Sequence, residues 1–247
     1  MSKITQSQIN PRLKMLYDMM PECGCMGDVG TDHGLLPIYC VQNGKCRRAV
    51  ASDLRAGPLE AARKNIALYH CETQIETLLC PGLEGYAERE CDTIVIAGMG
   101  GFTICSILAQ WLASCKRGND SPETRLFLLQ PNTAEHELRK FLWEHAFRIE
   151  EERAVCDGAH VYAGIKGRFT QQKELYTPMD CYTGKIMCRR MTEEDFIYYK
   201  ALLRKYENVL RGLCAKREPE DGDLQRIALC RQIVERIDQI IKGETMR

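Results

Sequence analysis

The amino-acid sequence predicts an α/β protein with a mostly parallel sheet, followed by a C-terminal α-helical hairpin. Strand-like apolar runs alternate with helical patterns over residues 9–168, as in sheets that are covered by helices. From about residue 196, apolar side chains recur in alternating steps of three and four, which indicates two helices packed on each other in a coiled-coil-like manner. We therefore expect a sheet domain over 1–168 and a linker with a helical hairpin over 169–247.

The first elements are predicted from apolar spacing and turn residues. Apolar side chains at helical spacing, stopped by Pro21, indicate an amphipathic helix near the N-terminus. Asn43-Gly44 indicates a turn, and Pro58 stands where a helix favours its first residue. In chain order, we expect a helix over 9–20, a strand over 25–28, a helix over 35–42, a strand over 48–53, a helix over 59–69 and a strand over 75–79.

The second half of the sheet domain contains the most apolar strand patterns. A continuous apolar run over 93–97 is typical of a strand covered on both faces, and Thr133 is expected to cap a helix. Asp157-Gly158 lies between two strand patterns and indicates a hairpin that adds an antiparallel edge. The expected elements are a strand over 93–97, a turn over 98–101, a helix over 104–112, a strand over 125–129, a helix over 133–145 and strands over 148–156 and 160–168.

The C-terminal region has a different pattern. Residues 170–190 show no clear periodicity, and we interpret them as a linker and docking segment. Two apolar seams follow, separated by a break at 219–222, and their few heptads favour packing within one chain over a long intermolecular coiled coil. The seam residues are Phe196, Tyr199, Leu203, Tyr206, Leu210 and Leu213 in the first helix, and Ile227, Cys230, Val234, Ile237 and Ile241 in the second.

Composition limits the function classes. The 247 residues are 45% hydrophobic, which suits one large domain with an appendage. Thirty-four basic and thirty-four acidic residues cancel, so a nucleic-acid site has to be a local patch. No apolar run is long enough to span a bilayer and no signal-peptide core is present, so we expect a cytoplasmic protein that does not bind membranes.

Fourteen cysteines raise the alternatives of disulfides or a metal site. No two CxxC motifs occur, and the five histidines do not combine with the cysteines at ligand spacing. We therefore expect no metal, and thiols that are reduced and act as small apolar side chains.

A glycine turn after the first strand is the strongest functional signal. Asp28 ends the strand, and Gly30 and Gly34 allow a positive φ and close approach of the backbone to a ligand. Asp53 ends the second strand about twenty residues further on, where a carboxylate can accept both hydroxyls of a ribose. Two ligands fit this arrangement, a dinucleotide or S-adenosylmethionine.

The spacing within the turn favours S-adenosylmethionine. Dinucleotides require G-x-G-x-x-G so that the pyrophosphate can lie on the helix N-terminus, whereas this turn has G-x-x-x-G with Asp32-His33 inside it. Asp32 repels an anionic pyrophosphate and attracts a sulfonium cation. An NAD-type oxidoreductase remains the alternative enzyme class, and a non-enzymatic adaptor that binds a protein through the helical hairpin is the other alternative.

Four segments resemble the TrmK family, bacterial methyltransferases that modify N1 of adenine 22 in tRNA. The resemblance implies a class I (Rossmann-like) methyltransferase fold, S-adenosylmethionine as the donor, tRNA as the partner and a helical hairpin that helps to hold it. No obligate protein partner is evident from the sequence. The segments are Asp28-Val-Gly-Thr-Asp-His-Gly-Leu-Leu-Pro37, Asp53-Leu-Arg-Ala-Gly-Pro-Leu-Glu-Ala-Ala-Arg-Lys-Asn65, Ile94-Val-Ile-Ala-Gly-Met-Gly-Gly101 and Leu129-Gln-Pro-Asn132.

Two departures from the family pattern concern the same turn and the loop after residue 79. Relatives usually carry an alanine and a tyrosine where this chain has Gly34 and Leu35. Relatives also tend to have an acid before the Gly-Leu pair, where Pro81 precedes Gly82 here. Pro81 cannot accept a hydrogen bond from the adenine amino group of the donor, so we expect that contact to come from elsewhere.

The motifs assign residues to three roles. Asp32 is expected to offset the positive charge that develops on the methylated base, while Asn132 or Gln130 orients the base edge. The alternatives are that Asp32 caps the following helix, that His33 packs or orients the substrate, that 98–101 is only a tight turn and that Asn132 is only a turn residue. The expected donor-binding residues are Asp28, Gly30, Thr31, His33, Gly34, Asp53, Leu54, Gly82, Leu83, Ala97, Gly98, Met99 and Gly100.

A local basic region is the candidate tRNA site. Between Lys185 and Arg217 there are nine basic and four acidic residues, although a solvated helix face gives the same pattern. A base inside a folded RNA has to be exposed before it reaches the donor, which requires a grip on the backbone. The candidate tRNA-binding residues are Arg189, Arg190, Lys200, Arg204, Lys205 and Arg211, with Arg47 and Arg48 expected near the catalytic mouth.

Overall fold

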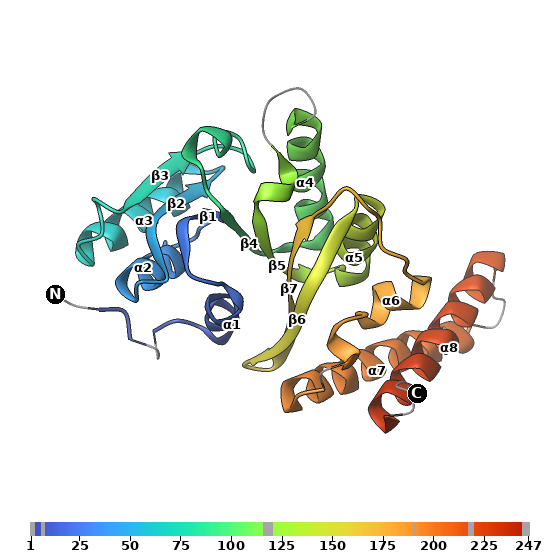
Figure 1. Ribbon diagram of the computed structural model, residues 1–247. Coiled ribbons are helices and arrows are strands. Elements are labelled where there is room, and N and C mark those ends of the chain that lie inside the picture. The colour runs from blue at the N-terminus through green and yellow to red at the C-terminus, as the bar shows by residue number, and fades with distance from the viewer. Residues whose placement is uncertain (1–2, 6–7, 116–120, 190, 217–219, 244–247) are drawn as a thin grey trace.

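The computed structural model describes residues 3–5, 8–115, 121–189, 191–216 and 220–243 (Figure 1). In these residues the chain forms seven strands that belong to one sheet. The strands are β1 (Cys23–Val29), β2 (Cys46–Asp53), β3 (Ile75–Leu79), β4 (Thr93–Gly100), β5 (Leu126–Thr133), β6 (Phe147–Asp157) and β7 (His160–Phe169). The helices are α1 (Pro11–Met19), α2 (Leu35–Gln42), α3 (Ala56–Leu68), α4 (Gly101–Cys115), α5 (Glu135–Glu144), α6 (Pro178–Thr183), α7 (Glu193–Cys214) and α8 (Asp221–Lys242).

The sheet has the strand order β3-β2-β1-β4-β5-β7-β6. The first five strands along this order are parallel to one another, whereas β7 pairs antiparallel with both β5 and β6. This confirms the predicted α/β class and its antiparallel edge. The chain leaves β1 toward β2 on one side and returns to β4 on the other, so a crevice opens at the carboxyl ends of β1 and β4.

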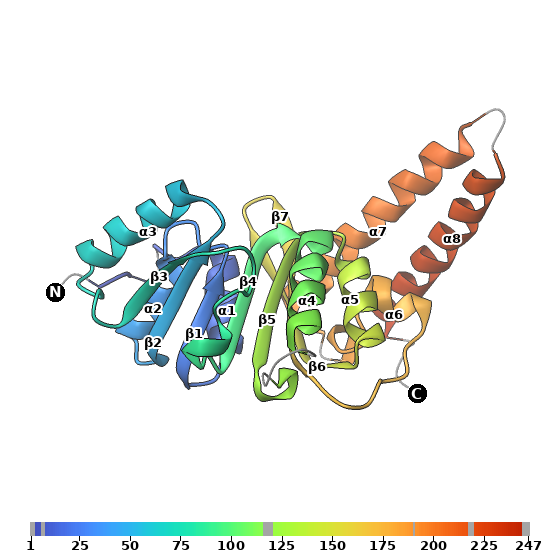
Figure 2. The same cartoon turned by 90° about the horizontal axis from the view of Figure 1, so that it is seen from above.

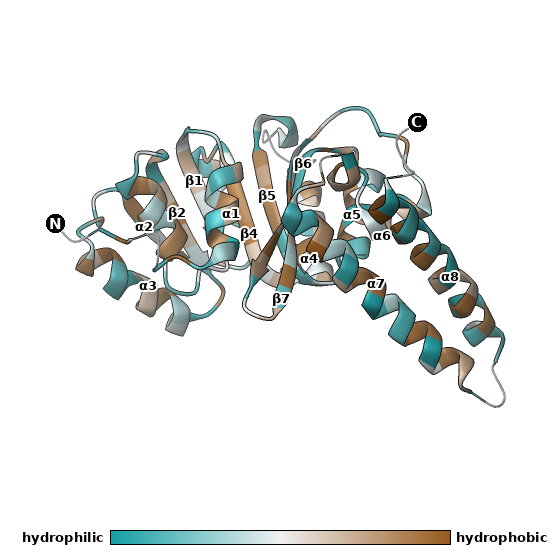
Figure 3. Cartoon of the chain, turned by 90° about the horizontal axis from the view of Figure 1, so that it is seen from below, coloured by the Kyte–Doolittle hydropathy of each residue, from teal (hydrophilic) through white to brown (hydrophobic). Residues whose placement is uncertain are grey.

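Helices cover both faces of the sheet. Alternate side chains of each central strand point to opposite faces, so Ile94 and Ile96 lie in one core cluster and Val95 in the other. The first cluster is closed by α4 and α5, and the second by α1, α2 and α3. Figure 3 shows apolar residues along most of β4 and β5, as expected for strands that are buried on both sides.

Three predicted helix starts are wrong. Helix α4 begins at Gly101, directly after β4, and not at residue 104. Helix α3 begins at Ala56, so Pro58 lies third in the helix, where its missing N–H costs nothing because the first amides have no intrahelical acceptor. Thr133 does not cap α5, because it pairs with Gly100 and extends β5. The N-cap residue of α5 is Ala134, with a φ of 55° and no side-chain cap.

The segment predicted as an irregular linker contains α6. Its Thr177 and Asp180 form a reciprocal capping box, a local signal that a helix of six residues can carry without visible periodicity. Gly184 follows it with a φ of 76°. A side chain at Gly184 would meet the carboxylate of Glu152, so this position requires glycine for two reasons.

A buried ion pair fastens this segment to the sheet domain. Arg139 of α5 donates from Nε to Oε1 of Glu152 on β6 at 2.7 Å, and both side chains are fully buried. Arg139 also donates to the carbonyl of Cys181, and Oε2 of Glu152 accepts the amides of Ile186 and Met187. These hydrogen bonds offset the desolvation of the two charges and fix the path of the chain into α7.

The predicted helical hairpin is confirmed, and Figure 2 shows it extending away from the sheet. Tyr199 and Ile237 are buried in the seam as expected. Leu202 and Ile233 are also buried although they lie off the predicted seam, because the base of the hairpin packs on Ala154 and Ala163 as well as on itself. Tyr199 further donates its hydroxyl to the carbonyl of Thr183 at 2.7 Å.

None of the helices in the described ranges is both long and apolar enough to cross a membrane. In the same residues, no three histidine, cysteine or acidic side chains are grouped so that they could hold a metal ion. All fourteen cysteines lie in the described part of the chain, where they are thiols without a disulfide bond.

Candidate active site

A cavity of about 450 Å³ lies at the carboxyl ends of the parallel strands. The segments after β1, β2, β4 and β5 each contribute to its wall, and the start of α1 closes it from the side of the antiparallel hairpin. Its lining residues are Asn10, Arg12, Leu13, Asp28, Gly30, Thr31, Asp32, His33, Gly34, Leu35, Leu36, Asp53, Arg55, Ala97, Gly98, Met99, Gln130 and Asn132. The topology therefore brings together most residues that the sequence assigned to donor binding or catalysis.

The glycine turn has the predicted backbone geometry. Gly30 and Gly34 have φ angles of 78° and 67°, in the left-handed region that favours glycine. The amides of Gly30 and Thr31 both donate to the carbonyl of Ser52 at 2.8 Å, which fixes the turn to the end of β2. A Cβ atom on Gly30 would lie 2.0 Å from Cε of Met99, so the β4 loop also packs against this position.

Asp28 is buried beneath the turn. Burial raises its pKa to about 6, the charge of Asp53 adds to this increase, and Thr31 opposes it. Asp28 therefore lies next to the end of β1 as a carboxyl group that titrates near pH 6. A cation bound in the cavity would favour its ionised form.

Asp53 is a buried carboxylate at the end of β2, with its side chain 9% exposed. Its Oδ1 accepts the amide of Arg55 at 2.7 Å and lies 3.5 Å from Nε of the same residue. Both contacts that the described residues make to this carboxylate use Oδ1. Oδ2 is thus available to a ligand in the cavity.

Asp32 and His33 form the exposed rim of the turn. Nε2 of His33 lies 3.4 Å from Oδ2 of Asp32, and the two side chains are 54% and 78% exposed. Asp32 does not cap α2, because Gly34 is the N-cap residue and no side chain caps there. The carbonyl of His33 accepts from Asn65 at 2.9 Å, so α3 holds the backbone of this rim while both side chains stay accessible.

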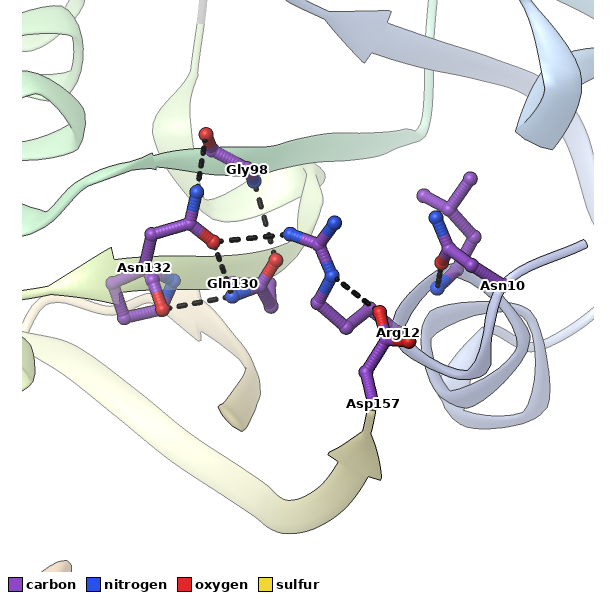
Figure 4. A network of polar contacts seen from close by, with 8 residues as sticks. Asn10, Arg12, Gly98, Gln130, Asn132 and Asp157 are labelled. Carbon is purple, nitrogen blue, oxygen red and sulfur yellow. Dashed lines mark hydrogen bonds and ion pairs between the residues drawn. The ribbon is translucent and has the colours of Figure 1, made fainter. Parts of the chain in front are cut away.

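A chain of amide hydrogen bonds joins the ends of β4 and β5 (Figure 4). Gln130 accepts the amide of Gly98 at Oε1 and donates from Nε2 to Oδ1 of Asn132. Asn132 donates from Nδ2 to the carbonyl of Gly98 at 2.7 Å. Gln130 is buried and both ends of its amide are engaged by the protein, so it shapes the Gly98 loop, whereas Asn132 lies at the exposed edge. Gly98 itself has a φ of 76°, and a Cβ atom there would enter open space.

Arg12 and Arg55 line the cavity without having been predicted. Arg12 donates from Nη1 to Oδ1 of Asn132 at 3.1 Å and from Nε to Oδ2 of Asp157 at 3.0 Å. Asn10-Pro11 is a helix-start signal, since Asn10 caps α1 by accepting the amide of Leu13. That signal places Arg12 in the first helical turn, but apolar spacing does not reveal that this turn lies over β5.

Four of the expected donor residues do not line the cavity. Leu83 is buried in the core cluster under α4, and Gly82 packs close to Ile107. Leu54 is 68% exposed beside Asp53, and Gly100 is paired with Thr133 in the sheet. The spacing identified the loops correctly but not which of their side chains face inward.

The candidate tRNA residues fall into two regions. Arg47 and Arg48 were expected near the catalytic mouth, and this placement is wrong because they begin β2, whose other end reaches the cavity. Asp53 lies five residues further along the strand than Arg48, about 16 Å away at a typical strand rise. On the hairpin, four exposed cations lie along α7, and Arg189 is exposed before it; these four are Lys200, Arg204, Lys205 and Arg211. Arg190 lies outside the described residues.

Comparison with known proteins gives consistent matches. The sequence model of a methyltransferase domain matches residues 9–165. A tRNA (adenine(22)-N(1))-methyltransferase of Bacillus subtilis is 30% identical over 186 residues, which are 74% of this chain and 75% of that protein. A putative tRNA methyltransferase of Mycoplasma pneumoniae is 28% identical over 209 residues, which are 84% and 90% of the two chains.

Two solved structures align with almost the whole chain. The structure of M. capricolum TrmK in complex with S-adenosyl-homocysteine is 25% identical, with a TM-score of 0.80 over 97% of this chain and 100% of that one. The structure of a putative tRNA (m1A22) methyltransferase of Streptococcus pneumoniae is also 25% identical, with a TM-score of 0.80 over 94% and 99% of the two chains.

The raised pKa of Asp28 predicts a pH-dependent stability. Between its ordinary value of 3.8 and its folded value of about 6, the folded state binds the proton and the unfolded state does not. Relative to Asp28→Asn, the wild type should therefore lose stability as the pH rises from about 4 to 6, by up to about 3 kcal/mol. Urea unfolding of both proteins across this range measures the difference.

The matched control is Glu60→Gln, which changes an exposed carboxylate on α3. Its difference from the wild type should stay nearly constant with pH. A flat profile for Asp28→Asn would show that Asp28 does not titrate in this window.

Proposed function

The chain belongs to the TrmK family of methyltransferases, and we infer from this membership that it transfers a methyl group from S-adenosylmethionine to N1 of adenine 22 in tRNA. The geometric observation that supports this function is the set of carboxylates around one glycine turn, formed by Asp28, Asp32 and Asp53. An NAD-type oxidoreductase and an adaptor, the alternatives raised by the sequence, are set aside by the family membership.

The residues present fit S-adenosylmethionine. The three carboxylates disfavour a pyrophosphate and favour a sulfonium cation in the same cavity. Gly98 leaves open space where a side chain would intrude, and Asp53 has one carboxylate oxygen free of contacts from the described residues. We propose that Asp53 accepts the ribose hydroxyls and that the turn from Gly30 to Gly34 lies against the methionine part of the donor.

S-adenosylmethionine supplies an electrophilic methyl group on sulfur, and the lone pair of adenine N1 forms the new N–C bond as the C–S electron pair returns to sulfur. Adenine N1 carries this lone pair at neutral pH, so the protein does not need a general base. Positive charge moves from sulfur to the adenine ring during transfer. Asp32 stands at the rim of the cavity, where we propose that its carboxylate stabilises the charge on the methylated ring.

The protein also has to align the target base with the donor methyl group and to exclude water from the site. Asn132 lies at the exposed edge of the cavity, with Nδ2 bound to Gly98 and one N–H of that group left for a ligand. We propose that Asn132 orients the base edge. Gln130 holds Asn132 in place, because it hydrogen-bonds both to Asn132 and to the amide of Gly98. His33 is accessible beside Asp32 and is proposed to orient the substrate.

Incubation with labelled S-adenosylmethionine and tRNA that lacks the modification tests the proposed function. We expect label in 1-methyladenosine at position 22, located by nuclease digestion and mass spectrometry. A tRNA with guanine at position 22 is the matched control and should stay unlabelled. Label at another base, or none with any tRNA, would contradict the proposal.

Asp32→Ala separates the role of the rim from donor binding. If Asp32 stabilises the charge on the methylated ring, kcat should fall by about tenfold or more, a larger factor than the increase in the Kd for S-adenosylmethionine that follows from losing one carboxylate near the sulfonium. Single-turnover rates and calorimetry measure the two quantities. Full activity of this variant would remove Asp32 from the mechanism.

We propose that the exposed cations of α7 bind the tRNA backbone. Deleting the hairpin would not test this cleanly, because Tyr199 and Ile233 pack against the sheet domain and their loss would expose a core. A variant that changes Lys200, Arg204, Lys205 and Arg211 to alanine should weaken tRNA binding and flatten its salt dependence. Its affinity for S-adenosylmethionine should stay unchanged, as measured by filter binding and calorimetry.

Arg63→Ala with Lys64→Ala on α3 is the control, since these cations lie on another helix. Equal tRNA affinity of the α7 variant and the wild type would place the tRNA site elsewhere.

A further inference from the structure

Arg12 joins three parts of the fold that are distant in sequence. It begins on α1 and reaches Asn132 at the end of β5 and Asp157 at the turn between β6 and β7. Its Cζ atom also lies 4.8 Å from the centre of the Tyr162 ring on β7. Figure 4 shows the guanidinium between Asn132 and Asp157, with the side chain of Gln130 next to that of Asn132.

The network determines the orientation of the Asn132 amide. Oδ1 of Asn132 accepts from Nε2 of Gln130 and from Nη1 of Arg12, while Nδ2 donates to the carbonyl of Gly98. A flipped amide would place its N–H groups against two donors and its oxygen against a carbonyl. Two donors on Oδ1 thus hold the remaining N–H of Asn132 in one direction.

The charge of Arg12 is balanced within the network. Nε of Arg12 lies 3.0 Å from Oδ2 of Asp157, and the two side chains are only about one quarter exposed. An unbalanced cation at the edge of the cavity would repel a sulfonium and weaken its binding there. Arg12 therefore supplies fixed hydrogen-bond geometry without a net positive charge.

We propose that Arg12 is a positioning residue for methyl transfer, which acts by fixing Asn132 and, through it, the Gly98 loop. Asp157 holds the guanidinium in place, so the turn between β6 and β7 contributes to the geometry of the site. This inference rests on the proposed function for its kinetic consequence, but its structural consequence at Gly98 does not depend on the substrate.

A double-mutant cycle tests whether Arg12 acts through Asn132. Arg12→Met and Asn132→Ala should each lower kcat by about tenfold or more, with the Kd for S-adenosylmethionine changed by less than about threefold. The double variant should be no worse than Asn132→Ala by more than about twofold, because the partner of Arg12 is already gone. Multiplying effects, or a loss confined to KM for tRNA, would indicate direct contact with the tRNA and overturn the proposal.

Variants of Asp157 test the same link if Arg12→Met folds poorly. Asp157→Asn keeps an oxygen that can accept from Nε and should retain kcat within about threefold, whereas Asp157→Ala should resemble Arg12→Met. Lys14→Met is the matched control, because Lys14 lies on the same helix and pairs with Asp18. A loss in Lys14→Met equal to that in Arg12→Met would reduce the effect to disturbance of α1 and overturn the proposal.

Hydrogen exchange gives a readout without tRNA. The Gly98 amide, which donates to Gln130, should exchange about tenfold faster in Arg12→Met than in the wild type or in Lys14→Met. Unchanged exchange would overturn the proposal. If the Gly98 amide exchanges faster in Arg12→Met but the wild type methylates no tRNA, the structural effect of Arg12 on Gly98 is supported. The proposed function is then refuted.

Discussion

The parallel pairing of β1, β2, β4 and β5 is the constraint on which the rest of the site depends. It brings the carboxyl ends of four strands to one edge, and the reversal of strand order between β1 and β4 opens the crevice there. Each strand then delivers one kind of group to the cavity. Asp53 ends β2, and Asp28, Gly98 and Asn132 lie near the carboxyl ends of β1, β4 and β5.

Much of the fold could be predicted because its signals are local. Apolar runs and turn residues located the strands, and regular spacing located α7 and α8. The errors came where long-range pairing decides the structure. Thr133 has the chemistry of a helix cap, but pairing with Gly100 keeps it in β5. Leu202 and Ile233 are buried although they lie off the heptad seam, because the sheet domain covers a second face of the hairpin.

In the candidate site, too, local signals predicted some residues, whereas long-range packing determines others. Residues within the glycine turn were found because their spacing and their chemistry lie in one stretch of sequence. Arg12 was missed because its function depends on the packing of α1 over the end of β5, 120 residues away. Leu83 was assigned to the donor site although it faces the core, since position in a motif does not determine side-chain direction. The prediction for Arg47 and Arg48 was wrong because both lie near the start of β2, whereas the cavity lies at its carboxyl end.

In the proposed mechanism one turn serves both substrates, because its glycines and the neighbouring Asp53 face the donor while its Asp32 faces the target adenine. A crystal structure of this chain with S-adenosyl-homocysteine tests it most directly. We expect both ribose hydroxyls within hydrogen-bond distance of Asp53 and the sulfur directed to the open side between Asp32 and Asn132. A ribose away from Asp53, or a sulfur enclosed away from Asp32, would contradict it.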